Sequence, residues 1–414
     1  MENGTLISGE RLLSDLKVLA GFGALPAGQG IDRPAFSPAY RQALAWLRAR
    51  MADAGMTVRM DAAGNLIGRL GPEHGSAIVC GSHVDTVPGG GALDGALGVM
   101  AGIEIARQIH ARSPDLKTAF EIVAFADEEG AFISLLGSRA MTGQLEADEV
   151  ADSTGRDGET LSAAMRDFGL APEDIRDASR PSQDIAAFLE LHIEQGPVLE
   201  AEGLEIGVVD SIVGLLSGTL LFHGQANHAG TTPLALRRDA MRAAAETVTK
   251  GFAAVETEFG EDVRLTFGAF KLSPDASNVV PGRAVLTFEI RAGTDVIIDS
   301  VLARLMAIAQ DCARRARVHV ERSIAGRDAA AAMSPDLTAR ILTAAGRLGY
   351  RARRMPSGAG HDAQALASFC PTAMVFVPSI GGISHNPAED TADQDLVRGA
   401  TLLCRVVMDL LELG

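Results

Sequence analysis

The sequence has few cysteines, no long apolar run and no N-terminal targeting pattern. Its four cysteines are Cys80, Cys312, Cys370 and Cys404. Because they lie far apart and form no Cys-x-x-Cys pair, we expect reduced core thiols in a cytoplasmic protein, not a disulfide framework. No apolar segment approaches the length of a membrane-spanning helix, and the first residues lack a basic segment followed by an apolar one. We therefore expect neither a membrane anchor nor a secretion signal.

Positive charge is also scarce. The chain has 37 basic and 53 acidic residues, which gives a formal net charge of -16 at pH 7. Nucleic acids and anionic membranes bind to basic surfaces, so this balance argues against both as partners. A small molecule is the expected partner, and an anionic substrate must then be bound by a few local arginines.

Apolar residues and glycine are abundant. Hydrophobic residues make up 47% of the 414 positions, and there are 45 glycines, a composition suited to α/β enzymes with many tight loops. The length exceeds that of a usual single-core domain, so two domains are expected. Strand-like and helical patterns alternate over residues 1–213 and 328–414, which predicts one discontinuous α/β domain with a mixed sheet and helices on both faces.

Residues 214–327 follow a different pattern. Their expected elements occur in the order β-α-β-β-α-β, with strands at 215–224, 263–272, 283–291 and 318–324 and helices at 239–259 and 294–316. This order is typical of a ferredoxin-like α+β domain. We therefore predict that residues 214–327 form a second domain, inserted into the first.

A glycine-rich loop in the first domain carries candidate metal ligands. Residues 76–80 read as a buried strand, so His83 and Asp85 follow at its carboxyl end, where open α/β sheets place their ligands. Asp85 can orient the His83 ring, and the glycines before Asp94 let the backbone approach a site closely. An alternative is a histidine that hydrogen-bonds only to the backbone, because a metal needs further ligands from elsewhere.

Acidic residues follow a second expected strand. The apolar segment 119–126 ends in Asp127, Glu128 and Glu129. An exposed acidic turn is the alternative interpretation, since Asp and Glu are mostly exposed. Buried carboxylates, however, are costly unless they are paired or bind a cation. Adjacent residues point to opposite sides, so one acid can bind a metal while its neighbour transfers a proton.

Two further histidines lie just after expected strands, His192 after residues 185–191 and His385 in a glycine-rich loop after residues 373–378. A lone histidine at either place is often structural. The full set of candidate ligands is His83, Asp94, Glu129, His192 and His385. Five such ligands suit a hydrolase with two divalent ions, which can share a carboxylate and a water, and Glu128 is then free to move protons.

The runs around these residues resemble a known family. They are Gly-Ser-His83-Val-Asp85, Gly-Ala-Leu-Asp94-Gly, Asp-Glu128-Glu129-Gly, Glu-Leu-His192-Ile-Glu-Gln195-Gly-Pro and Gly-Gly-Ile-Ser-His385-Asn. They look like the dinuclear metal amidohydrolases that include N-carbamoyl-L-amino-acid hydrolase, allantoate amidohydrolase and β-ureidopropionase. The resemblance covers nearly the whole chain. It implies hydrolysis of a ureido group on a carboxylate-bearing substrate, with release of ammonia and carbon dioxide.

The same resemblance implies roles for the metal residues. His83, Asp94 and His192 would bind one ion, and Asp94, Glu129 and His385 would bind the other, with Asp94 as the bridge. Glu128 would be the acid/base and Asp85 the partner of His83. The ions would be zinc or manganese, since both accept mixed histidine and carboxylate ligands.

The resemblance also gives the inserted domain a task as lid and homodimer interface. His228 would polarise the substrate carbonyl, in its own subunit or across the dimer, and Asn278 and Arg291 would bind the substrate carboxylate. Without the resemblance, His228 reads as a turn histidine and Arg291 as a solvated charge. Gln195, Gly360 and His361 would line the pocket.

One feature departs from the family pattern. Relatives usually carry an arginine and then an aromatic residue shortly after the Glu-Glu-Gly run, whereas this chain has Gly130-Ala-Phe132-Ile-Ser. The substrate is therefore left open between an N-carbamoyl amino acid and allantoate. Two alternatives remain at this point: an aminoacylase or dipeptidase of the same fold, and a binding protein that kept the fold without the chemistry.

Overall fold

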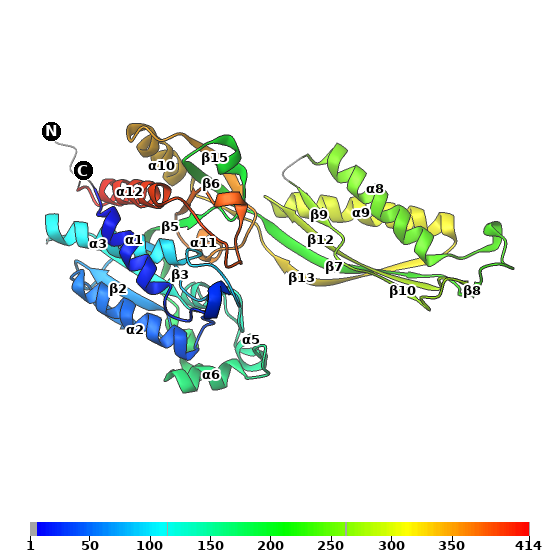
Figure 1. Cartoon of the computed structure of the whole chain (residues 1–414), viewed down its shortest axis with the longest axis horizontal. Helices are drawn as coiled ribbons and strands as arrows, with labels where there is room; N and C mark the ends of the chain where they lie inside the picture. Colours follow the sequence, from blue (N-terminus) through cyan, green and yellow to red (C-terminus); the bar gives the residue numbers. More distant parts are fainter. Residues whose placement is uncertain (1–5, 114, 261–262, 414) are drawn as a thin grey trace. The chain divides into compact units, whose positions relative to one another are not determined.

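The computed structural model describes residues 6–113, 115–260 and 263–413. It divides into two compact units, coloured along the chain in Figure 1. Unit 1 contains the chain up to Asp210 and from Met333 onward, and unit 2 contains Ser211–Ala332. The catalytic and dimerisation roles expected for residues 1–213 with 328–414 and for residues 214–327 remain predictions. The first five residues, expected to carry no targeting pattern, lie outside the described ranges.

Unit 1 is built on a mixed sheet. Its strands are β1 (Thr57–Met60), β2 (Leu66–Leu70), β3 (Ala77–His83), β4 (Ala119–Phe125), β5 (Ile185–Ile193), β6 (Ile206–Ile212), β15 (Ala352–Ser357) and β16 (Thr372–Val377). The order is β1-β2-β4-β3-β5-β16-β6, and β15 also pairs with β6. The central pairs β4–β3, β3–β5 and β5–β16 are parallel, whereas β2–β4 and β16–β6 are antiparallel. The predicted mixed α/β sheet is confirmed.

Helices pack against both faces of this sheet. The longer ones are α1 (Gly9–Leu19), α2 (Pro38–Asp53), α3 (Ala96–Arg112), α10 (Pro335–Arg347) and α12 (Asp393–Leu410). The shorter ones are α4 (Leu136–Met141), α5 (Ala147–Asp152), α6 (Leu161–Phe168), α7 (Val198–Glu202) and α11 (Asp362–Ala367). Helices α3 and α12 pack against β3, β5 and β16 on one face, and α11 packs against the same strands on the other. This double cover explains why β3, β4 and β16 are buried along their whole length.

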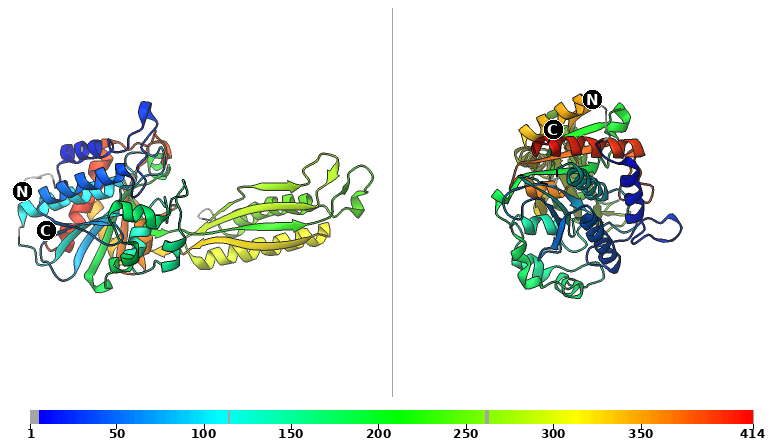
Figure 2. Two further views of the ribbon diagram at one scale, coloured as in Figure 1. Left: turned by 90° about the horizontal axis from the view of Figure 1, so that it is seen from below. Right: turned by 90° about the vertical axis from the view of Figure 1, so that its left-hand side faces the viewer.

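Unit 2 has the predicted ferredoxin-like arrangement. Its main elements are β7 (Gly214–His223), α8 (Ala240–Glu258), β9 (Arg264–Thr266), β10 (Phe270–Ser273), β12 (Arg283–Ala292), α9 (Asp295–Ala316) and β13 (His319–Asp328). Two short strands, β8 (Asn227–His228) and β11 (Val279–Val280), pair with each other, and β14 (Ala331–Ala332) pairs with Ser211 and Ile212 at the end of β6. The antiparallel sheet has the order β10-β12-β7-β13. Burial alternates along β7 and β12 because α8 and α9 cover one face of the sheet, as Figure 2 shows.

Two expectations about strands were wrong. The single strand predicted over 263–272 is two strands, β9 and β10, because their registers on β12 differ by one residue. Between them, Ala269 donates its N–H to the Thr287 side chain and accepts the Thr287 N–H. Strand β6 was not predicted at all, although Ile206–Ile212 pairs with both β15 and β16. Among the described residues, none of the helices has the length and apolar character needed to cross a bilayer.

Candidate active site

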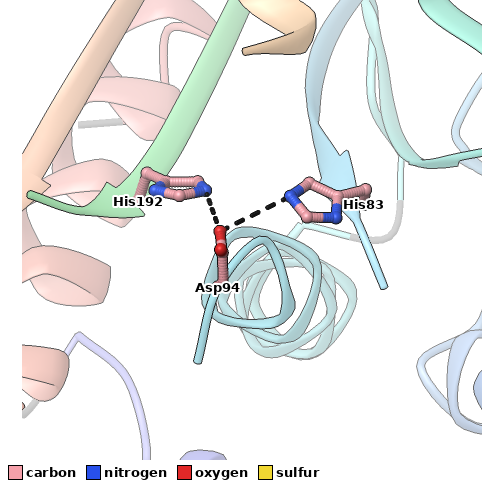
Figure 3. A group of neighbouring side chains, drawn as sticks. All are labelled: His83, Asp94 and His192. Carbon is pink, nitrogen blue, oxygen red and sulfur yellow. Dashed lines mark ion pairs between the residues drawn. The ribbon is translucent and has the colours of Figure 1, made fainter. Parts of the chain in front are cut away.

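Two histidines at the ends of neighbouring parallel strands face one carboxylate. His83 is the last residue of β3, and His192 lies near the end of β5. Their Nε2 atoms lie 3.6 and 3.1 Å from Oδ1 of Asp94, which precedes helix α3 (Figure 3). All three side chains are buried. Gly95 has a φ of +63°, and a Cβ there would overlap the His83 ring, so only glycine fits this approach.

Main-chain contacts fix which nitrogen of each ring faces Asp94. His192 Nδ1 lies 2.8 Å from the Ile193 carbonyl, and His83 Nδ1 lies 3.1 Å from the Asp85 carbonyl. A carbonyl only accepts, so each Nδ1 donates and each Nε2 carries the lone pair in the neutral ring. A lone pair directed at a carboxylate is repulsive unless a proton or cation lies between them. The donor set therefore fits a metal ion.

A second group forms on the other oxygen of Asp94. His385 Nε2 lies 3.1 Å from Asp94 Oδ2 and 3.5 Å from Glu129 Oε1. The hydrogen bond to Asp94 raises the pKa of His385 to about 9, and burial raises the pKa of Glu129 to about 7. Oδ1 faces the His83 and His192 rings while Oδ2 faces His385, so the Asp94 carboxylate lies between two groups of candidate ligands, a position that suits a bridging ligand.

The three consecutive acids after β4 have separate tasks. Asp127 accepts backbone N–H groups of Ala131, Phe132 and Ile133 at 2.7 to 3.0 Å, so it holds the loop in place. Glu128 Oε2 lies 3.4 Å from His83 Nε2 and is nearly buried. Burial raises the pKa of Glu128 well above its usual range, which suits a group that holds and releases a proton near neutral pH.

Asp85, expected as the partner of His83, contacts the His83 ring through both its main chain and its side chain. The nearest acceptor of His83 Nδ1 is the Asp85 carbonyl at 3.1 Å, while the Asp85 carboxylate is 3.7 Å away. Its other oxygen accepts the N–H of Glu129 at 3.1 Å. Asp85 therefore links the segment that follows His83 to the loop that carries Glu129.

Of the residues expected to line the pocket, Gln195 contacts Asp94, whereas His361 and Gly360 lie on the far side of His192. Gln195 donates to Asp94 Oδ2 at 3.0 Å and lies beside Ser384. His361 is buried behind His192, with ring centroids 4.5 Å apart, and its Nε2 contacts Ser357 Oγ at 2.9 Å. Burial lowers the pKa of His361 well below its usual range. His361 therefore supports the His192 ring from behind, and Gly360 precedes it in the loop between β15 and α11.

His228 and Asn278 lie together at one end of unit 2. His228 pairs with Val279, and the N–H of Ala229 donates to the Asn278 carbonyl at 2.9 Å. His228 Nδ1 accepts backbone N–H groups of Gly230 and Thr231 at 3.0 and 3.2 Å. In a neutral ring its exposed Nε2 then carries the hydrogen. This tautomer can donate to a carbonyl oxygen.

Arg291 lies at the opposite end of unit 2. It pairs with Leu215 at the start of β7, whereas Arg283 pairs with His223 at the end of β7. The eight steps along β12 from Arg283 to Arg291 span roughly 26 Å at about 3.3 Å per residue. Arg291 Nε also contacts Glu289 Oε1 at 2.8 Å.

Glu389 is a site residue that the sequence did not identify. Its Oε1 accepts the N–H groups of Leu93 and Asp94 at 2.9 and 3.1 Å, and its Oε2 accepts from Ser384 Oγ at 2.8 Å. It therefore ties the Asp94 loop to the loop that carries His385. The sequence held one indication of this role, because Glu389 is an acid four residues after the candidate ligand His385. Its partners could not be predicted, because they are main-chain groups nearly 300 positions away.

The family is established by comparison with known proteins. Residues 79–409 match the model of Peptidase family M20/M25/M40, so the chain belongs to this family. It is also 38% identical to an N-carbamoyl-L-amino acid amidohydrolase of Geobacillus stearothermophilus, over 98% of this chain and 99% of the relative. Identity to an allantoate amidohydrolase of Escherichia coli is 36%, over 95% of each chain.

Solved structures have the same fold. A hydantoinase/carbamoylase family amidase from Burkholderia phymatum superposes with a TM-score of 0.90, at 37% identity and 99% coverage of both chains. The chain is thus similar along nearly its whole length to amidohydrolases. The family and fold expected from the sequence are confirmed.

Proposed function

We propose that this chain is a metal-dependent amidohydrolase that cleaves a C–N bond of the ureido group in a carboxylate-bearing substrate. The substrate is an N-carbamoyl-L-amino acid or a related ureido acid such as allantoate, and the products include ammonia and carbon dioxide. The observation that carries the proposal is the Asp94 carboxylate, whose two oxygens face different histidines. The names of the full-length relatives support the reaction class.

Two divalent ions, zinc or manganese, are proposed as cofactors. His83, Asp94 and His192 would hold one, and Asp94, Glu129 and His385 the other. When bound, such ions polarise the scissile carbonyl and lower the pKa of a water. Histidine nitrogens and carboxylate oxygens are ligands that both metals accept.

Glu128 is proposed as the acid/base. Its carboxyl group lies beside the candidate ligands. Asp94 contacts three imidazoles, whereas among the described residues the only imidazole that Glu128 contacts is that of His83. Glu128 is therefore the acid that is most free to transfer protons. It can accept the proton of the attacking water and return it to the leaving nitrogen. Asp85 and Asp127 position it, because both hold the backbone of the loop that follows Glu128.

Substrate recognition is proposed to require a homodimer. His228 Nε2–H would donate to the substrate carbonyl, and Asn278 and Arg291 would bind its carboxylate. Because Arg291 lies roughly 26 Å along β12 from the end that carries His228, one copy of unit 2 cannot offer both to one small substrate. Leu234 and Leu236, 73% and 67% exposed in the segment after His228, support an interface there.

Mixed dimers test this assignment. His228→Ala and Arg291→Ala should each be nearly inactive alone. If the two residues of one site come from different chains, co-expressing the variants gives mixed dimers in which one of the two sites is fully wild type. Such a dimer should have up to half the activity of a wild-type dimer. If both residues come from the same chain, every site keeps one defect and no activity returns.

A substrate panel tests the reaction itself. Metal-reconstituted enzyme should release ammonia from N-carbamoyl-L-amino acids or allantoate, whereas an aminoacylase or dipeptidase would instead cleave N-acyl amino acids or dipeptides. Absence of ammonia from every ureido acid would reject the proposal. A cytoplasmic location is proposed as well, supported by four cysteines that are all buried and free.

A further inference from the structure

A cavity of about 580 Å³ in unit 1 reaches Glu129, one of the candidate metal ligands. Its lining includes Glu129, whose Oε1 lies 3.5 Å from His385 Nε2. It extends from there between the loop after β4 and the segment before α2. Its volume is typical of small-molecule sites. A substrate held at Glu129 can therefore extend a substituent into this cavity.

One part of the cavity wall is aromatic and apolar. Phe36 and Phe132 form an aromatic pair with ring centroids 6.1 Å apart, and Phe36 also packs edge-on against Phe168. Ala164, a buried residue of α6, also lines the cavity. The loop from Gly130 to Phe132 contributes no basic side chain to it. Aromatic walls of this kind favour an apolar group, which buries its surface against them.

The charged residues that line the cavity are mostly acidic. Apart from Glu129 they are Asp32, Asp157, Glu159 and Asp167, together with Arg41 and Arg156. Arg41 already donates to the carbonyls of Asp167 and Phe168, and its guanidinium lies 4.3 Å above the Phe168 ring. With four acids against two arginines, a second carboxylate on the substrate would meet repulsion.

We infer that this cavity binds the side chain of the substrate, and that the preferred substrates are N-carbamoyl-L-amino acids with large apolar side chains. The inference rests on the proposed ureido hydrolysis and chooses among its substrates. Allantoate, which carries a second polar ureido group in place of a side chain, and N-carbamoyl-L-glutamate are then poor substrates.

Filling the cavity from the wall formed by α6 tests the inference. Ala164→Leu adds a branched group to the lining, and Ala163→Leu makes the same change at the exposed neighbouring position of α6. With N-carbamoyl-L-phenylalanine, kcat/KM should fall by roughly tenfold or more in Ala164→Leu only. With N-carbamoylglycine, which has no side chain, both variants should stay within about twofold of the wild type.

A charge change gives a second test that does not disturb the core. Asp157→Lys should raise kcat/KM for N-carbamoyl-L-glutamate relative to the phenylalanine derivative by several fold, whereas Glu173→Lys, an exposed change away from the cavity, should not. Equal effects on all substrates, or a wild-type preference for allantoate, would overturn the inference. Loss of ammonia release from every ureido acid would instead reject the proposed function.

Discussion

The two ligand groups around Asp94 differ in how the fold supports them. The first, formed by His83 and His192, lies at the ends of buried parallel strands, and each ring donates Nδ1–H to a main-chain carbonyl. The second, formed by Glu129 and His385, lies on loops, and the His385 side chain is 50% exposed. We call them the strand group and the loop group. A rigid, buried group should hold its ion more tightly than an open one held by loops.

The loop group compensates with side-chain contacts that fix its backbone. Asp127 and Asp85 hold the loop that carries Glu129. Glu389 holds the loop that carries His385 against the one that carries Asp94. The strand group needs no such carboxylates for its backbone, because the sheet already fixes the ends of β3 and β5.

The largest expected effect comes from the residue that both groups share. Asp94→Asn removes the negative charge between them with little change in shape, so both ions should be lost and activity should fall below detection. Elemental analysis after dialysis measures the number of ions that remain bound per chain. Retention of two ions per chain would show that Asp94 is not the bridge.

Changing Glu128 should separate catalysis from binding in both groups. Glu128→Gln should lower kcat by about 10²- to 10⁴-fold, since it removes the acid/base. The metal content should equal that of the wild type. Persistent turnover at the wild-type rate would remove Glu128 from the proposed role.

Changing Glu389 should weaken the loop group selectively. Glu389→Ala should lower the affinity for the more weakly bound ion by roughly 10- to 100-fold, a range typical of residues that support ligands. Glu389→Gln should recover part of this affinity, because its amide oxygen still accepts the N–H groups of Leu93 and Asp94. The exposed Asp393→Asn serves as the control. Equal losses at both ions would contradict a selective role.

The pH dependence of metal binding should change the affinity at the loop group gradually. Because the pKa of His385 is raised to about 9, the ring is protonated at neutral pH before the ion binds. Affinity at the loop group should then fall about tenfold per pH unit between pH 9 and 7. Below pH 7 the fall should steepen to about a hundredfold per unit, since Glu129, with a pKa of about 7, is also protonated there. Calorimetry in buffers of different ionisation enthalpy counts the released protons, and a pH-independent affinity would refute this linkage.

The strand group could be predicted from the sequence, and the supports of the loop group could not. His83 and His192 follow apolar strands, and the carboxyl ends of parallel strands share one edge of a sheet, so their convergence follows from the pattern. Glu389 and Asp127 act through main-chain N–H groups, whose positions depend on loop conformations that no residue pattern encodes.

The second unit shows the same limit. The order of its helices and strands was predictable from periodicity. The separation of Arg291 from His228 required the register of β12 on β7, which pairs Arg291 with Leu215. The division of β9 from β10 likewise depends on their registers on β12, which differ by one residue.

Anomalous diffraction from crystals of the metal-loaded enzyme would test most directly whether the Asp94 carboxylate joins two ion sites. We expect two peaks per chain, one beside Oδ1 and the His83 and His192 rings, the other beside Oδ2, Glu129 and His385. A single peak, or two peaks that do not share Asp94, would contradict the dinuclear site.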